Sequence, residues 1–139
     1  MWVVYAVMAA IFASMVAILA KIGIDGIDSN LATAIRTVIV LIFTWLIVVL
    51  TVPLGSVKTL TAKNWTFLVL SGIATGLSWL CYFRAVQLGD VSRVAPIDKM
   101  SVALTIILAF VILGDPVSLQ VLIGGGLIVA GSLVMIFWK

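Results

Sequence analysis

Five long runs of apolar residues follow one another along the chain, and short polar segments separate them. The runs cover about residues 2–20, 31–52, 65–84, 94–113 and 119–138. Each is close to the roughly 20 residues that an α-helix needs to cross the hydrocarbon core of a bilayer. The segments between them are rich in Gly, Pro, Asp and Asn, which end helices and form turns. The pattern predicts five transmembrane helices in a single domain, residues 1–139.

The ends of these runs carry the residues expected at helix and membrane boundaries. Ser29 or Asn30 is expected to cap the second helix. Trp2, Trp65 and Trp138 lie at predicted span ends, where an amphipathic ring favours the membrane interface.

The fourth run is the least regular, because an aspartate and a lysine interrupt it. Residues 100–113 alone make about 21 Å of helix, which is short of the roughly 30 Å that a bilayer core requires. The run reaches full length only if its helix begins near Val94. Asp98 and Lys99 then lie about 6–8 Å inside one end of the span.

A carboxylate at that depth needs a partner or water, and its side chain is too short to reach the headgroups. Asp98 has no charged residue three or four positions away, so we expect its partner to come from another helix, with Arg36 and Arg84 as candidates. Arg36 and Lys99 either face the interior or extend to the headgroups, and the sequence leaves both options open.

Composition agrees with a membrane protein, since 65% of the residues are hydrophobic and 9% are charged, against about a quarter charged in soluble domains. The chain contains no His, and its acids are all Asp. The one cysteine, Cys81, excludes a Cys/His metal site. We therefore expect neither an enzyme nor a metal or cofactor. The net charge of +3 without a basic block gives no indication of nucleic-acid binding.

The distribution of basic residues predicts an orientation. Lys58 and Lys63 fall on the face that holds the N-terminus, whereas Lys21, Arg36, Arg84, Arg93, Lys99 and Lys139 fall on the other. The positive-inside rule then places the N-terminus outside and the C-terminus in the cytoplasm. Without Arg36 and Lys99 the bias falls to two against four.

Polar side chains, most of which carry hydroxyl groups, form stripes on three helices. The stripes comprise Ser71, Thr75, Ser78 and Tyr82; Asp98, Ser101 and Thr105; and Thr33, Thr37 and Thr44. Such stripes either line a water-filled path or bond to carbonyls of their own helix.

The fifth run has Gly124, Gly125, Gly126 and Ser132 but no ionisable residue. We therefore expect it to form a helix that packs against other helices and allows their backbones to approach closely.

The stretch YFRAVQLGDVSRVAPIDKMSVALTIILAFVILGD, together with Lys21 closing the first helix and Arg36 opening the second, resembles the EamA-type members of the drug/metabolite transporter superfamily. The resemblance covers nearly the whole chain. It departs from the family pattern at Asp98 and Lys99, where small residues are usual, and at Val102, where a proline is usual.

The resemblance implies one five-helix repeat of an inverted-repeat transporter in a bacterial or archaeal cell membrane. Because most relatives resemble two fused repeats with the solute between them, we expect a homodimer, antiparallel if this logic holds, or a second, oppositely oriented subunit.

The sequence thus favours a small secondary transporter or exporter of a polar metabolite, such as an amino acid or related zwitterion or anion, that works by alternating access. The expected solute-binding residues are Arg36, Thr75, Ser78, Trp79, Tyr82, Asp98, Lys99 and Ser101. Asp98 is also the candidate for ion coupling, since it is the acid that lies inside a span. The alternative is a lipid-carrier flippase subunit or membrane scaffold, in which the intramembrane charges are structural.

Overall fold

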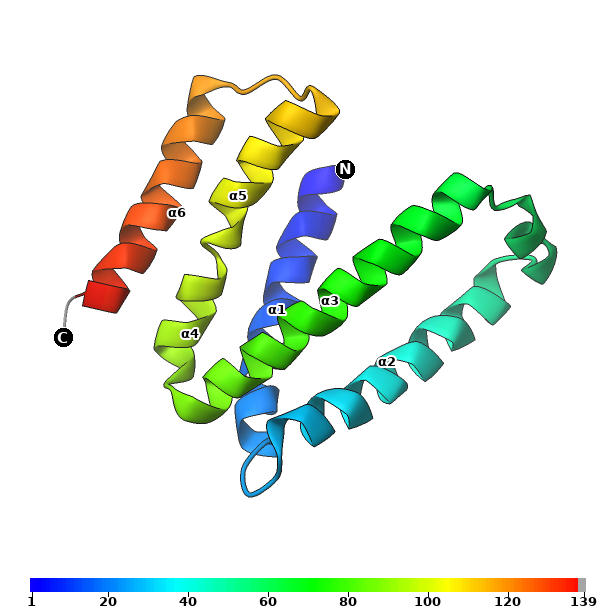
Figure 1. Cartoon of the computed structure of the whole chain (residues 1–139), viewed down its shortest axis with the longest axis horizontal. Helices are drawn as coiled ribbons and strands as arrows, with labels where there is room; N and C mark the ends of the chain where they lie inside the picture. The colour runs from blue at the N-terminus through cyan, green and yellow to red at the C-terminus, as the bar shows by residue number, and fades with distance from the viewer. Residues whose placement is uncertain (138–139) are drawn as a thin grey trace. The chain divides into compact units, whose positions relative to one another are not determined.

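The computed structural model describes residues 1–137, and every regular element in that range is a helix (Figure 1). The elements are α1 (Trp2–Gly23), α2 (Ser29–Thr51), the 3-10 helix η1 (Leu54–Thr59), α3 (Ala62–Leu88), α4 (Val91–Asp98), α5 (Ser101–Leu108), the π-helix η2 (Ala109–Leu113) and α6 (Leu119–Phe137). The prediction of an all-α chain is confirmed. Trp138 and Lys139, which we placed at the end of the last span, lie outside the described residues.

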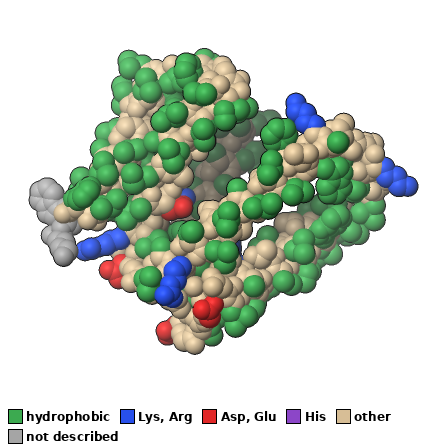
Figure 2. Space-filling view, in the orientation of Figure 1, with side chains coloured by type: hydrophobic (Ala, Val, Ile, Leu, Met, Phe, Trp, Pro, Cys, Tyr) green, Lys and Arg blue, Asp and Glu red, His purple; other side chains and the backbone are tan. Residues whose placement is uncertain are grey.

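Within residues 1–137, five segments are long and apolar enough to cross a membrane: α1, α2, α3, the segment Val91–Leu113 that joins α4, α5 and η2, and α6. The five predicted spans are therefore confirmed. Hydrophobic side chains dominate the visible surface in Figure 2, and charged ones are few. Most large apolar side chains are exposed, as expected for helices whose surroundings are lipid tails or further protein.

The chain divides into two compact units, one formed by Leu19–Gln87 and the other by Met1–Ile18 with the chain from Leu88 onward. In the first unit, the start of α2 is capped by Asp28, whose carboxylate accepts from the amides of Asn30 at 2.8 Å and Leu31 at 3.2 Å. The prediction that Ser29 or Asn30 forms this cap is wrong. The aspartate one position earlier reaches the amides that an N-cap satisfies.

The same unit has a small core where the end of α1, the start of α2 and the end of α3 meet. Its residues are Ala20, Ile24 and Phe83, against which Ala32, Trp79 and Tyr82 pack. Two hydrogen bonds fasten this end. Lys21 Nζ donates to the carbonyl of Val86 at 2.7 Å, and Gln87 Nε2 donates to the carbonyl of Ile27 at 2.8 Å. A cation is favourable at the C-terminal end of a helix, so Lys21 stabilises the end of α3.

In the second unit, α6 packs on α4 and α5. A Cβ atom built on Gly125 would lie 2.7 Å from Cδ1 of Ile106, whereas one on Gly124 or Gly126 would meet nothing within 4 Å. The expected close approach of the glycine-rich helix is therefore confirmed at Gly125, where the missing side chain lets α5 and α6 come together.

Replacing Gly125 by leucine is expected to lower the free energy of unfolding by about 1–3 kcal/mol, because the added side chain must push α5 away from α6. Thermal unfolding of the purified protein in detergent measures the effect. Gly126→Leu on the same helix is the matched control and should unfold near the wild-type temperature. An equal loss in both variants would mean that a leucine is tolerated equally badly at both positions, and that the contact with Ile106 does not set the result.

The fourth span differs from the single helix expected over residues 94–113. It begins earlier, at Val91, and it is interrupted between α4 and α5. At the interruption the amide of Lys99 donates to the carbonyl of Pro96 and the amide of Met100 donates to that of Ile97, both at 3.0 Å. These are i to i−3 bonds, which tighten the chain into a 3-10 turn. The expectation of a continuous helix is therefore wrong at this point.

Candidate functional site

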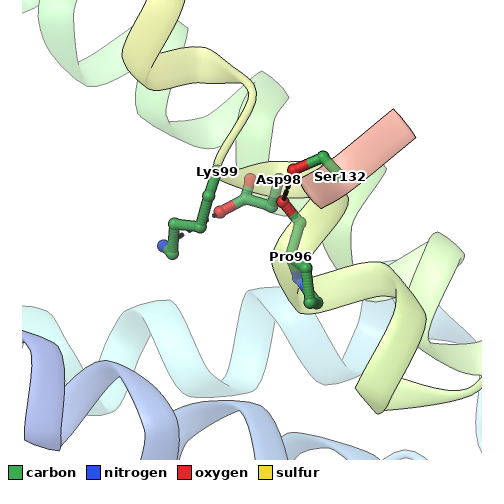
Figure 3. A network of polar contacts seen from close by, with 4 residues as sticks. All are labelled: Pro96, Asp98, Lys99 and Ser132. Carbon is green, nitrogen blue, oxygen red and sulfur yellow. Dashed lines mark hydrogen bonds and ion pairs between the residues drawn. The ribbon is translucent and has the colours of Figure 1, made fainter. Parts of the chain in front are cut away.

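The interruption of the fourth span carries an ion pair. Lys99 Nζ lies 3.2 Å from Asp98 Oδ2, and both side chains are partly exposed, 56% for Lys99 and 38% for Asp98 (Figure 3). Asp98 stands seven residues after the start of α4, which is about 10 Å along the span. The structure thus brings together two of the expected site residues and places them farther from the start of the span than the sequence indicated.

For Asp98 the structure shows the neighbouring Lys99 as the ion-pair partner, and the expected partner from another helix stays a prediction. That prediction assumed a regular helix, in which neighbouring residues do not face one another and partners lie three or four positions apart. Lys99 is instead the first residue after α4 and belongs to the tight turn. The turn removes the regular spacing, so two consecutive side chains can meet.

Arg36 contacts aromatic rings of its own unit, Leu19–Gln87. Its guanidinium carbon lies 3.5 Å from the centroid of the Trp79 ring and 5.4 Å from that of Phe83. A guanidinium over an aromatic face is stabilised by the ring quadrupole, most strongly over Trp. Arg36 stands seven residues after the start of α2, again about 10 Å along its span. The sequence left open whether Arg36 faces the interior or extends to the headgroups, and this contact favours the interior.

The rings beside Arg36 form a cluster on α3. Trp79 and Tyr82 are edge to face with centroids 5.9 Å apart, and Phe83 lies 5.9 Å from Trp79. The sequence singled out Trp79 and Tyr82 but missed Phe83, which is buried. Its position four residues after Trp79 was the available signal, because residues with that spacing share a helix face.

The hydroxyl stripes show the local bonding that was the alternative to a lining role. Thr75 donates to the carbonyl of Ser71 at 2.8 Å, and Thr105 donates to that of Ser101 at 2.9 Å. Each bond uses the one hydroxyl hydrogen and leaves lone pairs on the oxygen. Ser78, like Thr75 and Ser101, is exposed. These side chains are uncovered within the chain and keep the capacity to accept a hydrogen bond.

Ser132 is the functional candidate to which the sequence assigned no role. It is 2% exposed, and its hydroxyl lies 2.8 Å from the carbonyl oxygen of Pro96 on α4 (Figure 3). The carbonyl oxygen of Ile128 on its own helix is 2.9 Å away. A serine inside an apolar helix was visible in the sequence. Its contact with a residue 36 positions away was not.

Comparison with known proteins agrees with this architecture. Residues 1–137 match the EamA-like transporter family. A protein from Sinorhizobium sp, described as an uncharacterized transporter in cobO 3'region, is 42% identical over 134 residues, which cover 96% of this chain and 95% of that protein. No solved structure matches. The family match over almost the whole chain and the five apolar helices establish that the chain belongs to the EamA-like transporter family of integral membrane proteins.

Proposed function

We propose that the protein is a small secondary transporter that moves a polar metabolite, an amino acid or related zwitterion or anion, across a bacterial or archaeal cell membrane. The observation that supports this most directly is the interruption of the fourth span beside Asp98 and Lys99. Irregular backbone and charged side chains occur at membrane depth only where protein covers them or water reaches them. Interrupted helices with such groups form the solute and ion sites of secondary transporters.

Different charged residues would bind the two oppositely charged groups of a zwitterion. The guanidinium carbon of Arg36 lies 3.5 Å from the centroid of the Trp79 ring, and a guanidinium carries N–H donors whose spacing matches a carboxylate. Arg36 would bind the anionic group, with Lys99 as a second cation. Asp98 would hold an amine or carry a coupled proton. Trp79 and Tyr82 would form an aromatic wall, and Thr75, Ser78 and Ser101 would offer hydroxyl oxygens.

The unit of transport would be a dimer working by alternating access. Support comes from the exposure of the spans, since at most 11% of the residues in the apolar window of any one span are buried within the chain. A second copy in the opposite orientation would complete the solute site in the way that an inverted repeat does. An oppositely oriented partner protein would serve equally well. The charge distribution favours an outside N-terminus and a cytoplasmic C-terminus for this chain.

The test is uptake into proteoliposomes that contain the purified protein, with a panel of radiolabelled L-amino acids as probes. We expect saturable uptake of at least one of them, competed by its unlabelled form, and chemical cross-linking to a dimer in the same vesicles. Protein-free liposomes are the control. Uptake equal to this control for every amino acid, for their decarboxylated amines and for their deaminated carboxylates would contradict the proposal.

The Asp98–Lys99 ion pair also favours a second function, a flippase subunit or membrane scaffold whose charges are structural, because each side chain neutralises the other. The two functions assign different roles to the negative charge of Asp98. In a scaffold, loss of the Asp98 charge would disrupt cross-linking to the partner, whereas in the transporter it would reduce uptake and leave the assembly intact.

A further inference from the structure

The interruption of the fourth span coincides with an unusual sharing of one carbonyl oxygen. In a continuous α-helix the amide of Met100 would donate to the carbonyl of Pro96, four residues earlier. Here it donates to Ile97 instead, and the carbonyl of Pro96 accepts from the amide of Lys99 and from the hydroxyl of Ser132. A carbonyl oxygen has two lone pairs. The Ser132 hydroxyl therefore takes the acceptor site that the Met100 amide would use.

Pro96 alone does not account for the position of this break. A proline lacks the amide that would bond to residue 92, so it weakens the helix on its N-terminal side. The helix nevertheless continues through Pro96 to Asp98 and stops on the C-terminal side. A side chain inserted into the ladder of backbone hydrogen bonds is a recognised cause of such an interruption, and the hydroxyl of Ser132 stands in that position (Figure 3).

We infer that Ser132 is a positioning residue, which holds the fourth span open at Lys99 and Met100 and so brings Asp98 and Lys99 together. In a regular helix these consecutive side chains would point in different directions. Their pairing at 3.2 Å depends on the turn, and the turn depends on the hydrogen bond from α6. For its effect on transport this inference rests on the proposed function.

The bond is also one that can be released at low cost. The Ser132 hydroxyl has one hydrogen and two acceptors, since the carbonyl of Ile128 lies 2.9 Å away on its own helix. If the Ser132 hydroxyl donates only to the carbonyl of Ile128, the Met100 amide can donate to the carbonyl of Pro96 again. Neither change leaves a buried donor without an acceptor, which is the costly outcome when a hydrogen bond breaks. The fourth span thus has a broken form and a continuous form, between which Ser132 selects.

Ser132→Ala in the full-length protein in nanodiscs tests the inference through backbone amide hydrogen exchange at residues 99–103. Without the hydroxyl the helix closes and i to i−4 bonds replace the i to i−3 bonds of the turn, whose geometry is poorer. We therefore expect these amides to exchange about three- to tenfold more slowly. Ser132→Thr keeps the hydroxyl and should restore wild-type exchange. Ser14→Ala is the matched control, because that hydroxyl donates to a carbonyl of its own helix, at Ile11, and it should leave residues 99–103 unchanged.

Uptake kinetics give the second readout. Separation of Asp98 from Lys99 weakens solute binding, so Ser132→Ala should raise KM about three- to tenfold with a smaller change in maximal rate. Unchanged or faster exchange in Ser132→Ala would overturn the inference while leaving transport by the wild type untouched. Slower exchange with an unaltered KM would overturn the positioning role. Slower amide exchange in Ser132→Ala, together with no uptake of any solute probe by the wild type, would uphold the role of Ser132 in the break and reject the proposed function instead.

Discussion

Asp98→Asn is expected to reduce uptake of the transported amino acid by about ten- to hundredfold, the effect of losing one interaction that involves a charged group. Asparagine keeps the size of the side chain and removes the negative charge that would hold an amine or a proton. The pair with Lys99 is partly exposed, so its loss should affect stability little. Initial uptake rates in proteoliposomes measure the change, with cross-linking to the dimer as a check on assembly.

Asp115→Asn provides the matched control for Asp98→Asn. Asp115 is exposed and lies after the fourth span, between η2 and α6, so its variant should transport at close to the wild-type rate. The expected loss should also depend on the probe. Decarboxylated amines should lose uptake in Asp98→Asn, whereas deaminated carboxylates should lose little. Full uptake by Asp98→Asn, or failure of the dimer to form, would remove Asp98 from the solute site and favour the scaffold.

The fold followed from the sequence because its signals are long and redundant. Five apolar runs separated by helix breakers leave few arrangements for a chain in a bilayer. The boundaries were less accurate: α3 extends to Leu88, four residues beyond the predicted end, and Asp28 caps α2. The segment around Arg84 and Gln87 is too polar to be counted by hydropathy, yet it stays helical because Arg84 and Gln87 bond to each other and Gln87 bonds to Ile27.

The candidate site followed from the sequence only in part. Asp98, Lys99, Arg36 and Trp79 were found because charged and aromatic residues are conspicuous in apolar helices. Their partners were not, since pairing rules for a regular helix fail at a break. The break itself involves a hydrogen bond between Ser132 and Pro96, far apart in sequence. No local pattern shows which carbonyl a distant serine will meet.

Arg36→Gln should reduce uptake of the carboxylate-bearing probes by about ten- to hundredfold, because it removes the charge that would bind the anionic group. Arg36→Lys keeps the charge but loses the contact of the guanidinium with the Trp79 ring and the paired donors. We expect it to reduce uptake by about three- to tenfold, which is the order of one cation–π contact. Competition by deaminated carboxylates, measured in proteoliposomes, gives the affinity for the anionic group alone.

Arg93→Gln is the matched control for Arg36→Gln, since Arg93 is exposed near the start of α4 and should affect uptake little. The probes again separate the possible outcomes. If Arg36 binds the anionic group, Arg36→Gln loses competition by carboxylates and keeps competition by amines, the reverse of Asp98→Asn. If the two variants lose both kinds of probe equally, the charges act together on the structure of the protein. Recognition would then have to be sought on another part of the helices, and the division of a zwitterion between Arg36 and Asp98 would be wrong.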